Sequence, residues 1–303
     1  MSTNSYVILE NRGLLSVSGD DAVDFLQGLV SNDVTKVGAE RVLYSAMLTP
    51  QGKFLYDFFL MRLGNELLID CEADRLEELK RKLTMYKLRS KVVLKDRSDD
   101  FIVAALIGDS VAPALELDDQ EGSARSFLGG VAFVDPRVAQ IGGRCVLPRE
   151  NAAKLLVEKG FATGEADDYE IARLTLGLPD GSRDMTIDKA ILLENGFQEL
   201  NGVDWDKGCY MGQELTARTH YRGLVKKRLM PVRIDGPLPT PGTAIMHGDK
   251  EAGEMRSGTG EIGLAMIRLE PFEAISKSGE GLKAEGTKLF PVKPDWAVFK
   301  TDA

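Results

Sequence analysis

Hydrophobic positions in the first hundred residues switch between helical and strand spacing. Between residues 20 and 30 the apolar side chains recur three or four positions apart, as on one face of a helix. The same spacing in Leu76, Leu79, Leu83 and Tyr86 predicts a second helix. Apolar runs bounded by turn residues predict strands, over 42–48, 53–62, 66–71, 91–95 and 101–107. Strands surrounding helices in this order indicate an antiparallel or mixed α+β lobe.

The pattern changes twice in the rest of the chain. Residues 116–130 are first acidic and then rich in Ser and Gly, which predicts a mobile surface loop. Two strands and then two helices are expected next, over 131–134, 144–147, 151–159 and 167–176. After residue 223 short alternating runs rich in Gly and Pro indicate a small β-barrel or sandwich. We therefore expect an α+β region over 1–225 and a C-terminal barrel over 226–303.

One stretch of the C-terminal region fits the G-x-G-x-x-G pattern of a dinucleotide-binding loop. That loop must follow a strand and open a helix. Here Gly258–Gly263 is followed by residues 264–269, which look like a strand. We therefore interpret the glycines as a hairpin turn.

Composition excludes several classes of protein. The 303 residues carry a net charge of −9, which argues against a surface that coats nucleic acid. Three scattered cysteines form no disulfide framework and indicate a reducing compartment. No signal peptide is evident and no apolar run is long enough to span a bilayer, so we expect a cytoplasmic protein without membrane contact. Two His and three Cys are too few and too scattered for a metal site, so none is expected.

Positive charge is concentrated in one segment. Residues 207–233 contain seven Lys and Arg against the single acid Glu214, a net +6 on an acidic chain. Such a field would attract an anionic ligand or partner. A solvated basic face is the alternative for the later cluster Lys226–Arg228.

The densest chemistry lies in the octet Lys207–Glu214, with the sequence Lys-Gly-Cys-Tyr-Met-Gly-Gln-Glu. Its two glycines suit a tight loop, and a helix is expected to begin near Gln213. Cys209 would then precede a helix N-terminus with a lysine two residues away, a position that favours a reactive thiolate. Three roles stay open for Cys209: an inert buried thiol, a nucleophile served by His220, or a ligand shared with a partner protein, since one cysteine cannot hold a cluster alone.

The octet resembles the signature of the YgfZ family, folate-binding relatives of the glycine-cleavage T protein that are linked to iron–sulfur proteins. Other segments match the family in kind and order: Gly19–Ala22, Phe25–Gly28, Asn32–Val34, Pro50–Lys53, Tyr86–Arg89, Leu193–Gly196 and Arg222–Gly223. The resemblance implies an aminomethyltransferase-like α+β fold of two interwoven lobes with a C-terminal barrel. It also implies a tetrahydrofolate-binding accessory protein that supports assembly or repair of iron–sulfur clusters.

The resemblance assigns roles to individual residues. Glu194 would hold the pterin ring through paired hydrogen bonds. Arg218 and Arg222 would meet the glutamate tail of such a folate, with pairing to Glu214 or solvent as the alternative for both. Tyr210, Gln213 and Glu214 are expected to complete the folate site. Cys209 would lie near its mouth, with Lys207 tuning the thiol. The expected partners are iron–sulfur client or carrier proteins bound transiently, with a tRNA-modifying enzyme among the candidate clients.

Two other functions remain open. A folate-dependent aminomethyl or methyl transferase would need Asp57 or Glu214 to handle a proton. The T-protein pattern has paired aspartates where this chain has Tyr56 and Asp57, so one carboxylate is missing and an accessory role is favoured over an enzyme. A pure interaction protein, in which the basic segment is a docking surface, is the third possibility.

Overall fold

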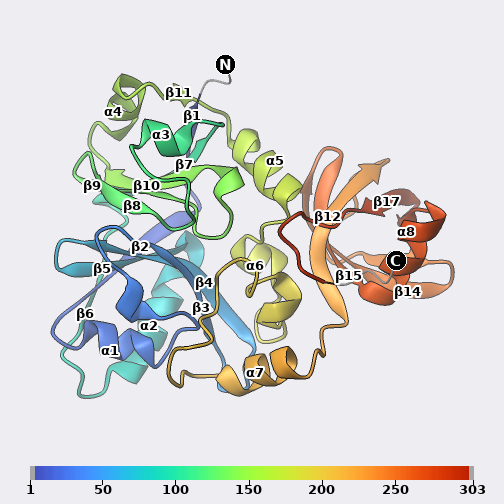
Figure 1. Cartoon of the computed structure of the whole chain (residues 1–303), viewed down its shortest axis with the longest axis horizontal. Helices are drawn as coiled ribbons and strands as arrows, with labels where there is room; N and C mark the ends of the chain where they lie inside the picture. The colour runs from blue at the N-terminus through green and yellow to red at the C-terminus, as the bar shows by residue number, and fades with distance from the viewer. Residues whose placement is uncertain (1–3, 300–303) are drawn as a thin grey trace. The chain divides into compact units, whose positions relative to one another are not determined.

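The computed structural model describes residues 4–299, drawn in colour in Figure 1. Contacts divide the chain into two compact units that alternate along the sequence. The first unit runs to Pro50 and adds Leu55–Tyr169 and Leu200–Gln213. The second contains Gln51–Phe54, Glu170–Glu199 and the chain from Glu214 onward. The predicted division at residue 225 stays a prediction.

The first unit is built on two sheets. The five-stranded sheet has the order β3-β4-β5-β2-β6. Its strands are β2 Arg12–Ser18, β3 Leu43–Leu48, β4 Phe54–Leu63, β5 Glu66–Glu72 and β6 Val93–Asp96. The six-stranded sheet has the order β11-β1-β7-β10-β9-β8. Its strands are β1 Ser5–Ile8, β7 Phe101–Ile107, β8 Ala124–Phe127, β9 Gly130–Val134, β10 Gly143–Pro148 and β11 Ala162–Thr163.

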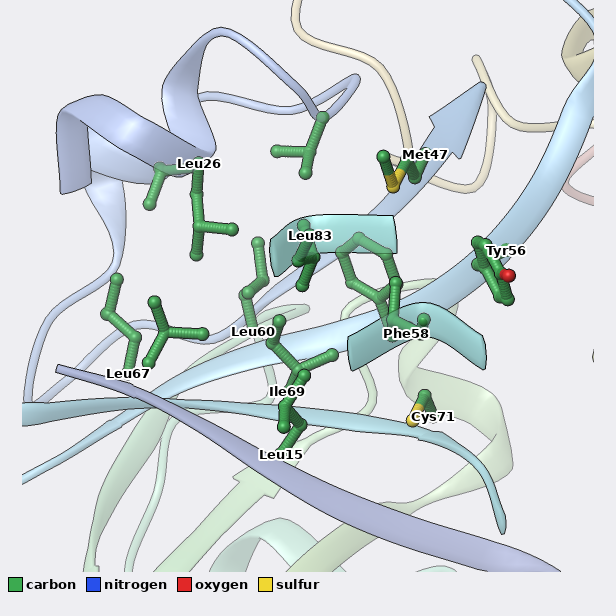
Figure 2. Packing of buried hydrophobic residues seen from close by; sticks show 14 of the residues in the cluster. Leu15, Leu26, Met47, Tyr56, Phe58, Leu60, Leu67, Ile69, Cys71 and Leu83 are labelled. Carbon is green, nitrogen blue, oxygen red and sulfur yellow. The ribbon is translucent and has the colours of Figure 1, made fainter. Parts of the chain in front are cut away.

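Helices α1 (Ala22–Gln27) and α2 (Leu76–Lys87) cover one face of the five-stranded sheet. Leu26 of α1 and Leu83 of α2 pack with strand residues such as Leu60 and Ile69 in one buried cluster, shown in Figure 2. Burial of these side chains stabilises the unit by about 1.5–3 kcal/mol for each fully buried aliphatic residue. The predicted helices and strands of the first hundred residues are thus confirmed.

The other helices and 3₁₀ turns are short connections or surface elements. The α-helices are α3 Val111–Ala114, α4 Ala152–Glu158, α5 Ala166–Leu176, α6 Gly181–Asp184, α7 Gln213–Tyr221 and α8 Leu269–Ser278. The 3₁₀ helices are η1 Val34–Lys36, η2 Ala73–Arg75, η3 Ala139–Ile141 and η4 Leu192–Asn195. None of the helices between residues 4 and 299 is long and apolar enough to cross a membrane.

The second unit contains a closed barrel of six strands in the order β12-β15-β14-β13-β16-β17, drawn in orange and red in Figure 1. The strands are β12 Lys227–Asp235, β13 Ala244–His247, β14 Lys250–Thr259, β15 Ile262–Arg268, β16 Leu282–Ala284 and β17 Thr287–Pro291. Thr259 pairs with Ile262 across a tight turn, so the glycine-rich stretch is a hairpin and no dinucleotide loop. The expected α+β fold with a C-terminal barrel is confirmed.

Two local expectations were wrong. The stretch 116–130, expected as a loop, contains the edge strand β8, which pairs with β9 from Ala124 to Phe127. The strand was missed because its run of alternating residues is too short to distinguish from a loop. Helix α8, in the C-terminal region where only strands were expected, buries Phe272 and Ile275 against the barrel interior. Its apolar residues are spaced as on a helix, but the surrounding glycines masked that pattern.

Candidate functional site

Lys207 is the anchor of the octet. Its side chain is buried, and Nζ donates hydrogen bonds to the backbone carbonyls of Gln27, Val30 and Asn32, at 2.9, 2.7 and 2.7 Å. The carbonyl of Gln27 ends α1, and the other two belong to the turn that follows it. Burial lowers the pKa of Lys207 to about 8, with Asp33 and Asp204 opposing the shift. All three ammonium hydrogens are used, so Lys207 holds the octet onto the turn after α1.

Further bonds fix the backbone on either side of Cys209. Asp204 Oδ1 accepts from the N–H groups of Asp206 and Lys207, at 2.9 and 3.0 Å. The N–H of Met211 donates to the carbonyl of Gly28 at 3.0 Å. Gln213 Oε1 accepts from the N–H of Tyr210 at 3.4 Å, and Lys207 Nζ lies 5.1 Å from the centre of the Tyr210 ring. The segment is therefore held at several points within the first unit.

Cys209 is exposed in the middle of this segment. The other two cysteines, Cys71 and Cys145, are buried, and burial raises the pKa of each thiol to about 12. Helix α7 begins at Gln213, directly after Gly212 with φ of 82°, so the expected loop before a helix is confirmed. Exposure excludes the inert buried role for Cys209. It is the only exposed cysteine among the described residues.

Asp57 lies on β4 inside the first unit, only 4% exposed. Tyr44 Oη donates a 2.8 Å hydrogen bond to its Oδ2. Burial, followed by the nearby Asp57 charge, raises the pKa of Tyr44 well above its ordinary value, so Tyr44 remains a donor. Asp57 is thus a buried, hydrogen-bonded carboxyl, and its predicted proton-handling role stays a prediction.

Glu194 lies on η4 in the second unit and lines a pocket of about 280 Å³. Its carboxylate lies 3.6 Å from Lys227 Nζ. Burial raises the pKa of Glu194, while the charge of Lys227 opposes the shift. The pocket combines carboxylates and cations from η4 and the barrel: Glu194, Lys226, Lys227, Glu251, Glu254, Arg256 and Arg268. This donor set can meet both N–H groups and carboxylates of a ligand.

Three other predicted folate contacts, Glu214, Arg218 and Arg222, are exposed on or just after α7. His220, the candidate base for Cys209, contacts Gln198 Oε1 through Nδ1 at 2.8 Å within the second unit. The roles predicted for these residues stay predictions.

The net charge of +6 on the basic segment 207–233 does not form one solvated surface. Four of its cations have internal partners. Lys207 binds carbonyls, Lys227 pairs with Glu194, Arg228 pairs with Glu199 at 2.9 Å, and Arg233 lies over the Phe290 ring.

A buried charge network in the first unit was not foreseen. It joins three arginines and two aspartates from both sheets: Arg12, Asp70, Asp135, Arg137 and Arg144. Asp70 on β5 accepts from Arg12 at 2.6 Å and from Arg144 at 3.3 Å. Burial opposes ionisation of Asp135, but Arg137 and Arg144 hold its pKa below the ordinary value. The sequence feature that could have predicted this network is a charged residue inside an apolar run, Leu67-Leu68-Ile69-Asp70-Cys71.

Comparison with known proteins agrees with this architecture. Residues 9–128 match the GCVT N-terminal domain, and residues 226–299 match the CAF17 C-terminal beta-barrel domain. The chain is 33% identical to the mitochondrial iron–sulfur cluster assembly factor IBA57 of Mus musculus, over 95% of this chain and 84% of the relative. The chain belongs to the IBA57 family. The Homo sapiens factor of the same name is also 33% identical, with the same coverage of both chains.

A solved structure supports the fold alone. The glycine cleavage system aminomethyltransferase T from Bartonella henselae matches with a TM-score of 0.76 at 16% identity, over 98% of this chain and 87% of that chain. The resemblance to YgfZ is confirmed as a GCVT-like domain with a CAF17-type barrel, although the matching relatives named above are IBA57 proteins and not YgfZ itself. Those relatives are named as mitochondrial, so the expectation of a cytoplasmic protein is wrong.

Proposed function

We propose that this protein supports the assembly or repair of iron–sulfur clusters in client enzymes, with Cys209 as the residue that meets the cluster or its carrier. The observation that carries the proposal is the exposed thiol on a segment fixed by the buried Lys207 ammonium. A protein that only packed Cys209 would not expose it. The names of the relatives, iron–sulfur cluster assembly factors, point to the same chemistry.

A single thiolate is suited to contacting an iron–sulfur cluster transiently but not to holding one by itself. Clusters are held by several thiolates, usually four, so Cys209 would share its cluster with ligands from a client or carrier protein. The buried Cys71 and Cys145 are unavailable for this purpose. The partner is therefore expected to supply the remaining ligands, and the complex to separate once the cluster is delivered.

We further propose that the protein binds tetrahydrofolate or another reduced folate. Residues of the Glu194 pocket fit such a ligand: the carboxylate would accept from the pterin amino group and ring N–H, and cations such as Lys226 and Arg268 would meet the anionic tail. A bound reduced folate can carry one-carbon units or act as a structural ligand. The contribution of this chain is to bind and orient it.

A folate-dependent C1 transferase is the rival function. It would need a carboxylate free to exchange a proton with the folate nitrogen. Asp57 is 4% exposed and already accepts from Tyr44, and the neighbouring position carries Tyr56 in place of a second acid. These features favour the accessory role.

The thiol claim is tested by complementation. Cells that lack the protein receive the wild-type chain, Cys209→Ser, or the control Asp206→Asn, which changes an exposed neighbour in the same segment. We expect the serine variant to be expressed normally but to leave a panel of cluster-dependent enzymes inactive, while the control restores them. Normal enzyme activity with Cys209→Ser would refute the proposal.

The folate claim is tested separately by anaerobic calorimetry with tetrahydrofolate. We expect saturable binding that Glu194→Gln weakens by about 1.5–3 kcal/mol, as for a charged hydrogen-bonding group. Glu285→Gln, at an exposed acid of the barrel outside this pocket, is the matched control. Absence of binding heat removes the folate claim, and turnover of methylated amines would establish the transferase.

A further inference from the structure

The C-terminal end of α2 exposes an apolar surface that the fold does not need. Leu76, Leu79 and Leu83 of this helix are buried in the core. Its last residues behave differently, since Met85 is 71% exposed and Tyr86, expected on the core face, is 39% exposed. Adjacent exposed apolar side chains of this kind mark interaction sites.

Leu88, the next apolar residue, is held in a strained backbone. Its φ of 44° and ψ of −106° lie in a region that a bulky side chain rarely adopts, and its side chain is 89% exposed. The turn is closed by Ser90, whose N–H donates to the carbonyl of Lys87 at 2.8 Å. Backbone strain of this kind costs about 1–3 kcal/mol and persists mainly at functional positions. The turn thus presents a leucine to solvent.

Positive charge surrounds these side chains. Residues 80–91 carry six Lys and Arg and no acid, on a chain with a net charge of −9, although Lys80 and Lys91 pair with the neighbouring acids Glu77 and Asp20. Among residues 4–299, Lys87 and Arg89 of the turn form no salt bridge. Together with the nearby Asp21, the turn lines a shallow surface hollow. Unpaired cations around an apolar centre are complementary to a surface with carboxylates around an apolar group.

The same turn lies near the Cys209 segment because both are attached to α1. At one end of α1, Asp21 Oδ2 accepts from the N–H of Lys91 at 2.7 Å. At the other end, the carbonyl of Gly28 accepts from the N–H of Met211, two residues after Cys209. From Asp21 to Gly28 is a rise of about 10 Å at helical spacing. All of these residues belong to the first unit.

We propose that Met85–Lys91 is the docking surface for an acidic partner protein whose bound surface reaches Cys209. This inference rests on the proposed function in one respect, namely that a partner must approach the thiol. The cations of this surface attract the acidic partner, and an apolar group of the partner packs on Met85 and Leu88.

The test uses a peptide probe that reacts with Cys209. The probe is a ten-residue peptide with an N-terminal cysteine activated as the 2-thiopyridyl disulfide, a Gly-Ser spacer, and Asp and Glu around one leucine. The Cys209 thiolate attacks the peptide sulfur, a new disulfide forms, and thiopyridone leaves and is followed by its absorbance. A spacer of five extended residues spans about 17 Å, enough to bridge the length of α1.

We expect the acidic peptide to react about ten-fold faster than a Lys-containing counterpart at low salt, with the difference lost at high salt. The double variant Lys87→Glu, Arg89→Glu should remove this preference, whereas Lys154→Glu, Lys159→Glu, at exposed positions on α4 and directly after it, should keep it. Leu88→Gly, which relieves the strained backbone and so should fold normally, should slow the acidic peptide alone. All variants should react equally with neutral dithiodipyridine, which reports only on the thiol.

Equal rates for acidic and basic peptides, or a double variant that keeps the preference, would overturn the docking proposal. Competition by single-stranded RNA stronger than by an acidic peptide without cysteine would also overturn it, in favour of nucleic acid. These outcomes are independent of the proposed function. A docking surface that fails here while Cys209→Ser still abolishes support of cluster enzymes would leave the thiol claim intact.

Discussion

Replacing Lys207 by methionine tests whether its ammonium builds the Cys209 segment. The change keeps an unbranched side chain one atom shorter and removes the donors to three carbonyls. The bonds to Val30 and Asn32 are buried, whereas the bond to Gln27 is partly exposed, so water can replace that donor. A buried acceptor left without a donor costs about 1–3 kcal/mol, so two of them should cost about 3 kcal/mol.

The assay is urea denaturation at pH 7, below the Lys207 pKa of about 8, so that the parent carries the ammonium. Trp205 lies two residues from the substitution, and a Trp296→Phe background removes the other tryptophan. In a thermal melt followed by the same fluorescence, a loss of about 3 kcal/mol should lower the melting temperature by roughly 5 °C, because the unfolding entropy is about 2.1 cal/mol/K per residue and the chain has 303 residues. Lys154→Met on exposed α4 is the control. If the free energy of unfolding of Lys207→Met lies within about 0.5 kcal/mol of that of its parent, the stabilising role of the Lys207 ammonium is refuted.

Three further predictions follow from burial. At pH 8 a thiol reagent should label Cys209 alone in the native protein and all three cysteines after denaturation, because burial raises the pKa of Cys71 and Cys145 to about 12; mass spectrometry of the labelled sites checks this. Asp70→Asn should lower the free energy of unfolding by about 3–5 kcal/mol, because the buried Arg12 and Arg144 both lose this anionic partner; an unchanged midpoint in a denaturant titration would contradict this. As the pH is lowered, tetrahydrofolate affinity should fall at a higher pH than an ordinary glutamate would give, because burial raises the pKa of Glu194 and protonation removes the hydrogen-bond acceptor. Calorimetry from pH 5 to 8 checks this. An affinity that does not change with pH in the wild type, as in Glu194→Gln, would contradict it.

Much of the architecture could be predicted because apolar spacing responds directly to burial. The leucines of α2 recur at helical spacing, and three of them are buried. The barrel strands were visible as short alternating runs, of which β12 and β15 are now paired. Tyr86 shows the limit of this reasoning, since the spacing alone placed it in the core while the chain leaves it partly exposed.

The residues of the candidate site were named from the sequence, and their roles stay predictions, but the contacts between them could not be predicted. The octet and the Asn32–Val34 segment were both recognised in the sequence, yet nothing in either indicated that Lys207 binds the turn containing Asn32. The two segments are 175 residues apart, and such pairing depends on the folded chain. Lys207 consequently looked like a cation acting on the thiol, whereas its ammonium is bound to backbone carbonyls; an effect on Cys209 stays a prediction.

The central claim is that Cys209 supports the cluster content of other enzymes. The most direct measurement is the iron and acid-labile sulfide bound per polypeptide in a four-iron cluster enzyme purified from cells that carry wild type, Cys209→Ser or Asp206→Asn. The account predicts full occupancy with wild type and the control, and low occupancy with Cys209→Ser at equal amounts of the enzyme polypeptide. Equal occupancy in all three strains would contradict it.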